Sequence, residues 1–216
     1  MKRYAGRPLR SALEVGAGTG KATRLFAARG IHVTAIEPDV KMAHMLKRTT
    51  RGLPVAQVVT TFELFETARR FDLVFTAAAW HWTDPATRWV RAAELLVPNG
   101  VLALFGSPTQ LADPDLAAAV HEIEKQALPD DDPAVIHPWS IEEMAAAGGL
   151  IDCERCVLAR VVTRTSADVV GRLATVSAYV ALSPAARAEA LRLVYAVLPD
   201  RVAIDATVQL CLARRR

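Results

Sequence analysis

A glycine-rich segment near the start of the chain constrains the fold more than any other feature. Residues 14–20 read Glu-Val-Gly-Ala-Gly-Thr-Gly, between a short apolar run at residues 11–13 and a helix-like segment at residues 21–29. Glycine allows backbone conformations and close contacts that a Cβ atom would block. The start of a helix also offers unpaired N–H groups to a polar ligand. We therefore predict a strand, a glycine turn and a helix, with the turn lying against a bound ligand.

The spacing of these glycines separates two classes of ligand. The dinucleotide fingerprint is G-x-G-x-x-G, in which the third glycine packs the helix against the strand. In this chain the third glycine lies one position early, at Gly20, and Lys21 stands at the dinucleotide position. An NAD-type oxidoreductase therefore remains only an alternative.

The second predicted strand ends at an acidic residue. Residues 31–36 alternate in polarity and are rich in β-branched side chains, which is typical of a strand. Glu37 follows, at about 20 positions after the glycine loop, where a carboxylate suits the two hydroxyls of a ribose. A carboxylate only accepts hydrogen bonds, and a vicinal diol supplies two donors. We expect Glu37 to bind a ribose, Pro38 to end the strand and Asp39 to cap the next helix.

The rest of the first half alternates strands with helices. Such alternation predicts a parallel sheet covered by helices on both faces, with ligands at the carboxyl ends of the strands. The segment at residues 61–70 has room for little more than a short or irregular helix. The predicted strands are 11–15, 31–36, 55–59, 71–75 and 100–105, and the predicted helices are 20–29, 39–49 and 85–96.

Three motifs resemble one enzyme family. The form E-x-G-x-G-x-G at residues 14–20 resembles motif I of the class I methyltransferases that use S-adenosylmethionine. The strand Phe71-Asp72-Leu73-Val74 is similar to the F-D-L-V pattern of that superfamily, and the segment A-W-H-W-x-D-P at residues 79–85 resembles a bacterial branch of type 11 small-molecule methyltransferases. The resemblance implies an α/β, Rossmann-like, doubly wound sheet of seven strands, mostly parallel with the last strand antiparallel.

The same resemblance implies a function and a cofactor. It implies transfer of a methyl group from S-adenosylmethionine to a small organic acceptor. A catalytically silent protein that binds the cofactor or a metabolite is the alternative from another class. In the family, the glycine loop meets the amino-acid end of the cofactor, the loop after the third strand edges the adenine, and small residues after the fourth strand leave room for the methionine part. The implied cofactor-binding residues are Glu14, Gly16, Gly18, Gly20, Glu37, Pro38, Thr61, Phe62, Glu63 and Ala77.

Bulky residues follow where an acceptor would lie. His81 is the candidate catalytic residue, because an imidazole with an ordinary pKa of about 6.5 can take a proton from an acceptor or hydrogen-bond to it. Trp80 and Trp82 flank it, and three roles stay open for them: lining an apolar or aromatic acceptor pocket, shielding the sulfonium by cation–π attraction, or packing in the core. Trp139, in a later segment, is a further substrate-binding candidate.

The second half of the chain is predicted to complete one domain of residues 1–216. Residues 1–106 form the cofactor-binding half, the proline-rich residues 107–149 a cap insertion, and residues 150–216 a sheet edge with helices. Only about ten residues precede the first strand, where relatives have one or two helices that close over the cofactor. Two explanations stay open at this point: either the chain begins late, or the cap and a partner subunit supply this cover, and the second explanation favours a homodimer. The predicted helices here are 114–128, 140–147, 167–178 and 184–198, and the predicted strands are 150–162 and 202–213.

Composition argues against several other classes. The net charge is only +3 and its excess lies at the chain ends, which argues against a nucleic-acid partner. No apolar stretch approaches the ~18 residues that span a bilayer, so we expect a cytoplasmic protein. Cys153 and Cys156 form a C-x-x-C within a predicted strand, which places them on opposite faces. No second pair of ligands completes a zinc site, and the carboxylates of residues 130–132 are expected to be solvated, so we expect no metal.

Overall fold

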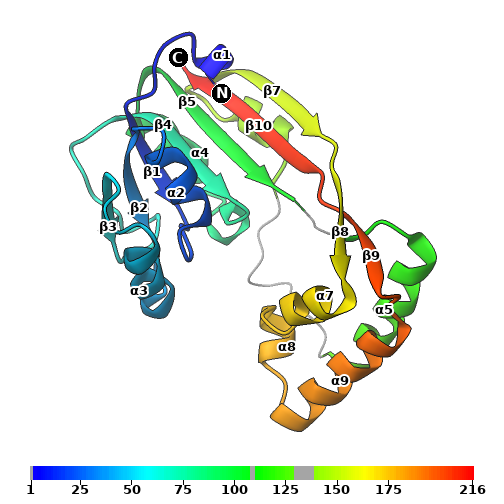
Figure 1. Cartoon of the computed structure of the whole chain (residues 1–216). Helices are drawn as coiled ribbons and strands as arrows, with labels where there is room; N and C mark the ends of the chain where they lie inside the picture. The colour runs from blue at the N-terminus through cyan, green and yellow to red at the C-terminus, as the bar shows by residue number, and fades with distance from the viewer. Residues whose placement is uncertain (1, 108–109, 129–138) are drawn as a thin grey trace. The chain divides into compact units, whose positions relative to one another are not determined.

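The computed structural model describes residues 2–107, 110–128 and 139–216 (Figure 1). The chain divides into two compact units. The first unit comprises residues 1–106, 134–157 and 209–216, and the second comprises residues 107–133 and 158–208. The chain therefore passes from one unit to the other four times. The prediction that residues 107–149 cap the site, within one domain, stays a prediction.

A seven-stranded sheet forms the centre of the first unit, in the order β3-β2-β1-β4-β5-β10-β7. The first five strands in this order pair in parallel, and β10 pairs antiparallel with β5 (Figure 1). The predicted mostly parallel sheet with an antiparallel last strand is thereby confirmed. The strands are β1 (Ser11–Val15), β2 (His32–Ile36), β3 (Val55–Val58), β4 (Phe71–Ala77), β5 (Leu96–Gly106), β7 (Leu150–Leu158) and β10 (Val208–Arg215).

Helices cover both faces of this sheet. One face packs with α2 and α3, where Leu73 of β4 shares a core with Ala22 and Leu46. The other face packs with α4 and α6, where Val74 shares a core with Ala92 and Met144. Because neighbouring residues of β4 are buried on opposite faces, the strand is an apolar run rather than an alternating one. The helices of this unit are α1 (Lys2–Ala5), α2 (Lys21–Ala27), α3 (Val40–Thr49), α4 (Arg88–Leu95), α6 (Ile141–Ala146) and the 3₁₀ turn η1 (Trp80–Trp82).

In the second unit, the described residues form a small antiparallel sheet and four helices. The strands lie in the order β6-β9-β8, and a separate core that includes Val194, Val202 and Ile204 joins them to the helices. The elements are β6 (Gln110–Leu111), α5 (Pro114–Ala127), β8 (Val161–Thr165), α7 (Ser166–Leu173), α8 (Ser177–Val180), α9 (Pro184–Val197) and β9 (Arg201–Asp205).

Two predicted strands were too long, and the second sheet was not predicted. The strand expected at residues 150–162 is β7 followed by β8, and the strand expected at residues 202–213 is β9 followed by β10. At the breaks, the Ala206 N–H donates to the Arg160 carbonyl at 2.8 Å. Each strand thus leaves one sheet and enters another, and no glycine or proline marks the break. The helix expected at residues 167–178 is likewise divided into α7 and α8.

The described residues contain neither a membrane-spanning helix nor a metal-binding group of side chains. No helix within this part of the chain is long and apolar enough to cross a membrane. The same part of the chain holds no group of three or more His, Cys, Asp or Glu side chains arranged to bind a metal ion. The acidic run at residues 130–132 lies outside the described residues.

Asp72 organises the amino-terminal edge of the large sheet. Its Oδ2 accepts hydrogen bonds from the Arg10 and Ser11 N–H groups at 2.9 Å, and its Oδ1 accepts from Arg7 Nη1 at 2.6 Å. Burial raises the pKa of Asp72, but these hydrogen bonds and the Arg7 charge outweigh burial and hold the pKa below its usual value. The carboxylate therefore joins the segment before β1 to the start of β4.

We expect Asp72→Ala to lower the free energy of unfolding by about 2 kcal/mol, because two backbone N–H groups lose a charged acceptor. Urea unfolding at neutral pH, followed by circular dichroism, measures the change. Glu66→Ala, which removes an exposed carboxylate of the loop before β4, is the control and should change stability by less than about 0.5 kcal/mol. Equal stabilities of the two variants would contradict this role of Asp72.

Candidate functional site

The carboxyl ends of β1 and β2 bring the glycine loop and Glu37 together. The Gly18 N–H donates to Glu37 Oε2 at 2.8 Å, and the Asp39 N–H donates to Glu37 Oε1 at 3.0 Å. The Glu37 side chain is only 6% exposed. A carboxylate has about four acceptor positions, so Glu37 holds the loop and still has positions for two further donors.

The structure of the turn after Glu37 agrees with the prediction made from its sequence. Pro38 is exposed and lies two residues after Ile36, the last residue of β2, so the strand ends just before it. Asp39 is the N-cap of α3, because its Oδ1 accepts from the Met42 N–H at 2.7 Å. The predicted strand end and helix cap are both present.

The three glycines of the loop have different surroundings. A Cβ on Gly16 would lie 2.4 Å from the Ala79 Cβ, so the loop packs directly on the segment after β4. A Cβ on Gly20 would lie 2.8 Å from Leu46 Cδ1, so this glycine packs α2 close to α3. Gly18 has a φ of +56° and faces open space. Close packing therefore requires Gly16 and Gly20, whereas Gly18 leaves room on the side where a ligand would lie.

Glu14 is a buried acid on β1. Its side chain is 1% exposed, and its Oε2 accepts from Thr23 Oγ1 at 2.5 Å. Burial raises the pKa of Glu14 to about 8, although the hydrogen bonds from Thr23 oppose the rise, and the Glu37 carboxylate adds to it. The Glu14 carboxyl therefore joins β1 to α2 and is mostly protonated at neutral pH. Its predicted role at the ammonium of the cofactor stays a prediction.

The backbone is strained just after β4. Ala78 has a φ of +58°, and its N–H donates to the Phe105 carbonyl at 2.8 Å. A non-glycine residue in this conformation costs on the order of 1 kcal/mol or more, and such residues gather at functional sites. Ala77, the predicted site residue, is half-buried beside it. Sequence reasoning missed Ala78; the only signal was the run of three alanines at residues 77–79.

The two candidate substrate tryptophans of η1 differ in exposure. Trp80 is 2% exposed, and its ring centroid lies 5.5 Å from that of Phe62 and 5.3 Å from that of Trp89. Trp82 is 54% exposed. Trp139 is half-buried, and its ring centroid lies 6.0 Å from that of Trp89, with the two rings roughly perpendicular. The structure thus places Trp80 in the core and leaves Trp82 accessible.

His81 lies between Trp80 and Trp82 in the sequence and is half-buried. Its ring centroid is 4.9 Å from that of Trp82. Burial lowers the pKa of His81 below its ordinary value, so the imidazole is neutral at pH 7. A neutral imidazole can accept a proton, which is what the predicted base role requires.

The loop at residues 59–70, between β3 and β4, forms no helix, whereas the sequence predicted a short or irregular one at residues 61–70. Thr61 Oγ1 accepts from the Leu64 N–H at 3.3 Å. Glu63 Oε1 accepts from the Asp84 N–H at 2.9 Å, which ties this loop to the segment after η1. Phe62 is buried against Trp80. The predicted adenine loop and the predicted acceptor segment are therefore in direct contact.

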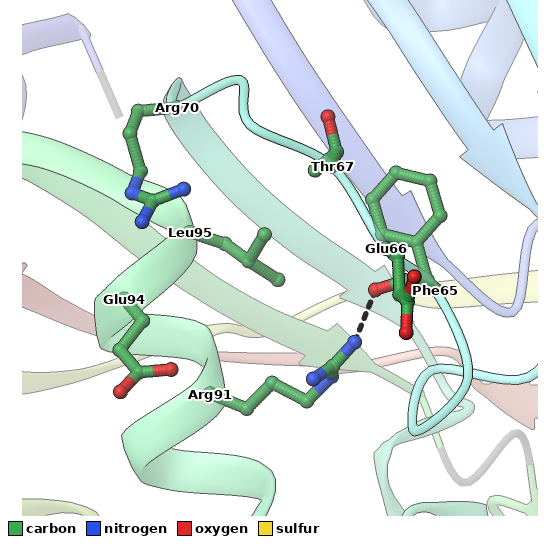
Figure 2. Close-up of a pocket in the computed structure, with 7 residues that line it drawn as sticks. All are labelled: Phe65, Glu66, Thr67, Arg70, Arg91, Glu94 and Leu95. Atoms are coloured by element: carbon green, nitrogen blue, oxygen red, sulfur yellow. Dashed lines mark hydrogen bonds between the residues drawn. The ribbon is translucent and has the colours of Figure 1, made fainter.

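A pocket of about 250 Å³ lies beside this loop (Figure 2). It lies at the amino-terminal ends of the strands, because Arg70 directly precedes β4 and Leu95 directly precedes β5. The glycine loop is at the opposite ends, so this pocket is distinct from the predicted cofactor site. Its lining residues are Phe65, Glu66, Thr67, Arg70, Arg91, Glu94 and Leu95.

The raised pKa of Glu14 predicts a pH dependence of stability. The native state retains a proton on Glu14 up to about pH 8, whereas an unfolded chain releases it near the ordinary value of 4.5. The contribution of this group to the free energy of unfolding is therefore full below the unfolded pKa and is lost as pH rises through the folded pKa. We expect Glu14→Gln, which imitates the protonated acid, to lose less stability than the wild type between pH 5.5 and pH 8.5, roughly the span between these two pKa values. Urea unfolding at both pH values measures this, and parallel losses in the two proteins would contradict it.

Comparison with known proteins identifies the family to which the first part of the chain is similar. Residues 13–104 match the profile of a family described as "Methyltransferase domain". An uncharacterized methyltransferase of Mycobacterium tuberculosis is 39% identical over 95 residues, which are 44% of this chain and 39% of the relative. The trans-aconitate 2-methyltransferase of Methylobacterium radiotolerans is 35% identical over 130 residues, 58% of this chain and 49% of that enzyme. The matches thus span less than half the length of these relatives.

The fold has relatives among solved structures as well. A protein of Anaeromyxobacter dehalogenans, for which a type II methyltransferase role is suggested, superposes with a TM-score of 0.63. It is 21% identical, and the match covers 99% of this chain and 94% of that protein, so this likeness concerns the fold alone. The segment that matches the family profile, residues 13–104, holds most of β1, the glycine loop, Glu37 and the end of β4. Residues 13–104 therefore belong to the methyltransferase domain family, whose members use S-adenosylmethionine.

Proposed function

We propose that this chain transfers a methyl group from S-adenosylmethionine to a small organic acceptor. The observation that carries the proposal is the pair of hydrogen bonds by which Glu37 accepts from Gly18 and Asp39, because they place a nearly buried carboxylate directly beside the glycine loop. S-adenosylmethionine supplies an electrophilic methyl carbon on a sulfonium, and its sulfur leaves with the bonding electron pair. The protein then has mainly to align the acceptor and exclude water.

The residues present fit an adenosine cofactor. The two remaining acceptor positions of Glu37 suit the two ribose hydroxyls. The open space at Gly18 admits a ligand that a side chain would obstruct. Thr61 and the accessible edge of the loop that carries it would border the adenine, while Phe62, being buried, would support that border from behind. Ala77 would leave room for the methionine part.

The acceptor would lie beside His81 and Trp82. Trp82 offers an exposed ring, and His81 offers an imidazole that is neutral at pH 7. The base is needed only by an acceptor that must lose a proton, such as a phenol or an ammonium, because a carboxylate is already ionised. Since one relative is a trans-aconitate 2-methyltransferase, small polycarboxylates are the first acceptors to examine. We place the reaction in the cytoplasm and propose a homodimer, both on the sequence arguments above.

The first test of the proposal is cofactor binding by a Gly18→Val variant. We expect its Kd for S-adenosylhomocysteine in isothermal titration to rise by at least about tenfold, or 1.4 kcal/mol, because the new side chain occupies the open space beside Glu37. Glu37→Ala should weaken binding by about tenfold as well, since the ribose loses its acceptor.

Gly30→Val is the matched control for backbone strain. Gly30 also has a positive φ, +79°, and also faces open space, but it lies beyond the other end of α2. The two valine variants should lose similar stability, on the order of 1–2 kcal/mol, while Gly30→Val keeps its affinity. Equal affinities of Gly18→Val and the wild type would refute this cofactor site. Tight binding without methylation of any acceptor would instead favour the catalytically silent protein.

A second test separates the roles of His81. We expect His81→Ala to lower kcat for phenol or amine acceptors by about a hundredfold, and for carboxylate acceptors by only a few fold. For the first group, the rate of the wild type should rise with pH through a pKa below 6.5 and then stay constant, because the base must be neutral. Radiolabelled methyl transfer measures both. His44→Ala, on the exposed side of α3, is the control, and equal losses for all acceptors would argue against a base.

A further inference from the structure

The loop between β3 and β4 is held without a helix of its own. Residues 59–70 contain no regular element, yet Phe62 and Phe65 are both buried. A buried backbone carbonyl that lacks a hydrogen-bond partner is costly. In a helix, the neighbouring turn would supply these partners. Here they must come from another part of the chain.

Arg91 of α4 supplies them. Its Nε donates to the Phe62 carbonyl at 2.7 Å, and its Nη2 donates to the Phe65 carbonyl. Its guanidinium carbon also lies 5.5 Å from the centroid of the Phe62 ring. Figure 2 shows the side chain extending from α4 toward the loop, with the hydrogen bond to Phe65 drawn. One side chain therefore holds two carbonyls and one ring of the same loop.

The shape of the guanidinium explains why arginine stands here. Its planar fork presents several N–H donors in fixed directions, whereas a lysine ammonium is a compact point charge. The two carbonyls are three residues apart, and Nε and Nη2 reach one each. Hydrogen bonds from a charged donor are also stronger than neutral ones.

The loop held in this way contacts the rest of the site. Phe62 packs on Trp80, and Glu63 accepts from the Asp84 N–H. Thr61, the predicted neighbour of the adenine, directly precedes Phe62. A movement of the Phe62 backbone would therefore displace both the adenine border and the start of the acceptor segment.

We propose that Arg91 is a positioning residue for cofactor binding, which fixes residues 61–65 against α4 and so sets the border of the adenine site. The proposal rests on the proposed function, because it assumes that this loop borders S-adenosylmethionine. Arg91 itself lies behind the loop and lines the pocket at the amino-terminal ends of the strands, away from the glycine loop.

The pocket beside Arg91 makes a rescue experiment feasible. Its volume of about 250 Å³ opens next to the guanidinium, between the loop and α4. In Arg91→Ala this space would grow by the missing side chain and could admit methylguanidinium. Arg70 lines the same pocket, and its Nη1 donates to the carbonyl of its neighbour Arg69 at 3.3 Å and not to the loop carbonyls that Arg91 holds. Arg70→Ala is therefore a matched control for loss of one arginine from this surface.

The experiment measures the Kd for S-adenosylhomocysteine together with hydrogen–deuterium exchange of residues 61–66 in the absence of cofactor. We expect Arg91→Ala to weaken binding about tenfold and Arg91→Lys by a smaller factor, because lysine keeps the charge but loses the fork. Exchange of the loop should be faster in Arg91→Ala. Millimolar methylguanidinium should restore part of the affinity of Arg91→Ala and leave the wild type and Arg70→Ala unchanged.

Several outcomes would overturn the proposal. Wild-type affinity in both Arg91 variants would do so, as would equal weakening by Arg70→Ala. If Arg91→Ala does not fold, the Arg91→Lys variant provides the test. Wild-type exchange of the loop together with a wild-type Kd in Arg91→Lys would contradict the positioning role of Arg91. Failure of the wild type to bind S-adenosylhomocysteine would count against the proposed function. The exchange measurement then still tests whether Arg91 holds the loop, since it needs no cofactor.

Discussion

The burial of the parallel strands on both faces is the constraint from which the site follows. Helices α2 and α3 cover one face of the sheet and α4 and α6 the other, so β1 and β4 can carry almost no exposed polar groups along their length. Polar groups that can bind a ligand therefore lie at the ends of the strands. At the carboxyl ends lie the glycine loop, Glu37 and η1, and at the amino-terminal edge lies Asp72.

The site at the carboxyl ends is held by contacts between loops that are distant in sequence. Glu37 holds the glycine loop, Gly16 packs on Ala79, and Glu63 holds the backbone at Asp84. Each contact needs a specific small residue or a specific acceptor, which is why glycines, alanines and carboxylates gather here. The strained Ala78 is part of the same arrangement. A change in one loop would therefore displace the neighbouring loops. Arg91 stabilises the loop between β3 and β4 from the side of α4.

The sequence predicted well where structure is set by neighbouring residues. The order of strands and helices in residues 11–106 and the cap by Asp39 agree with the structure, although β5 begins at Leu96 instead of residue 100 and the segment before β4 holds no helix. It predicted poorly where one strand passes from one sheet to another. Residues 150–162 and 202–213 are β-rich without interruption, and the breaks at Arg160 and Ala206 arise from a contact between the two segments themselves. The sequence also left open whether Trp80 lies in the core or in a pocket, because the same aromatic residues occur in both settings, and the structure places it in the core.

By itself, the sequence determined the local parts of the site: a glycine loop between a strand and a helix, and an acidic residue one strand later. Those features depend on backbone freedom and on the chemistry of single side chains, which are readable from residue types and spacing. Only the tertiary structure decided that Glu37 bonds to Gly18, that Glu14 is buried enough to stay protonated, and that Arg91 holds two carbonyls of another loop. Such properties depend on which distant groups meet and how much water they exclude, and neither is encoded in a local pattern.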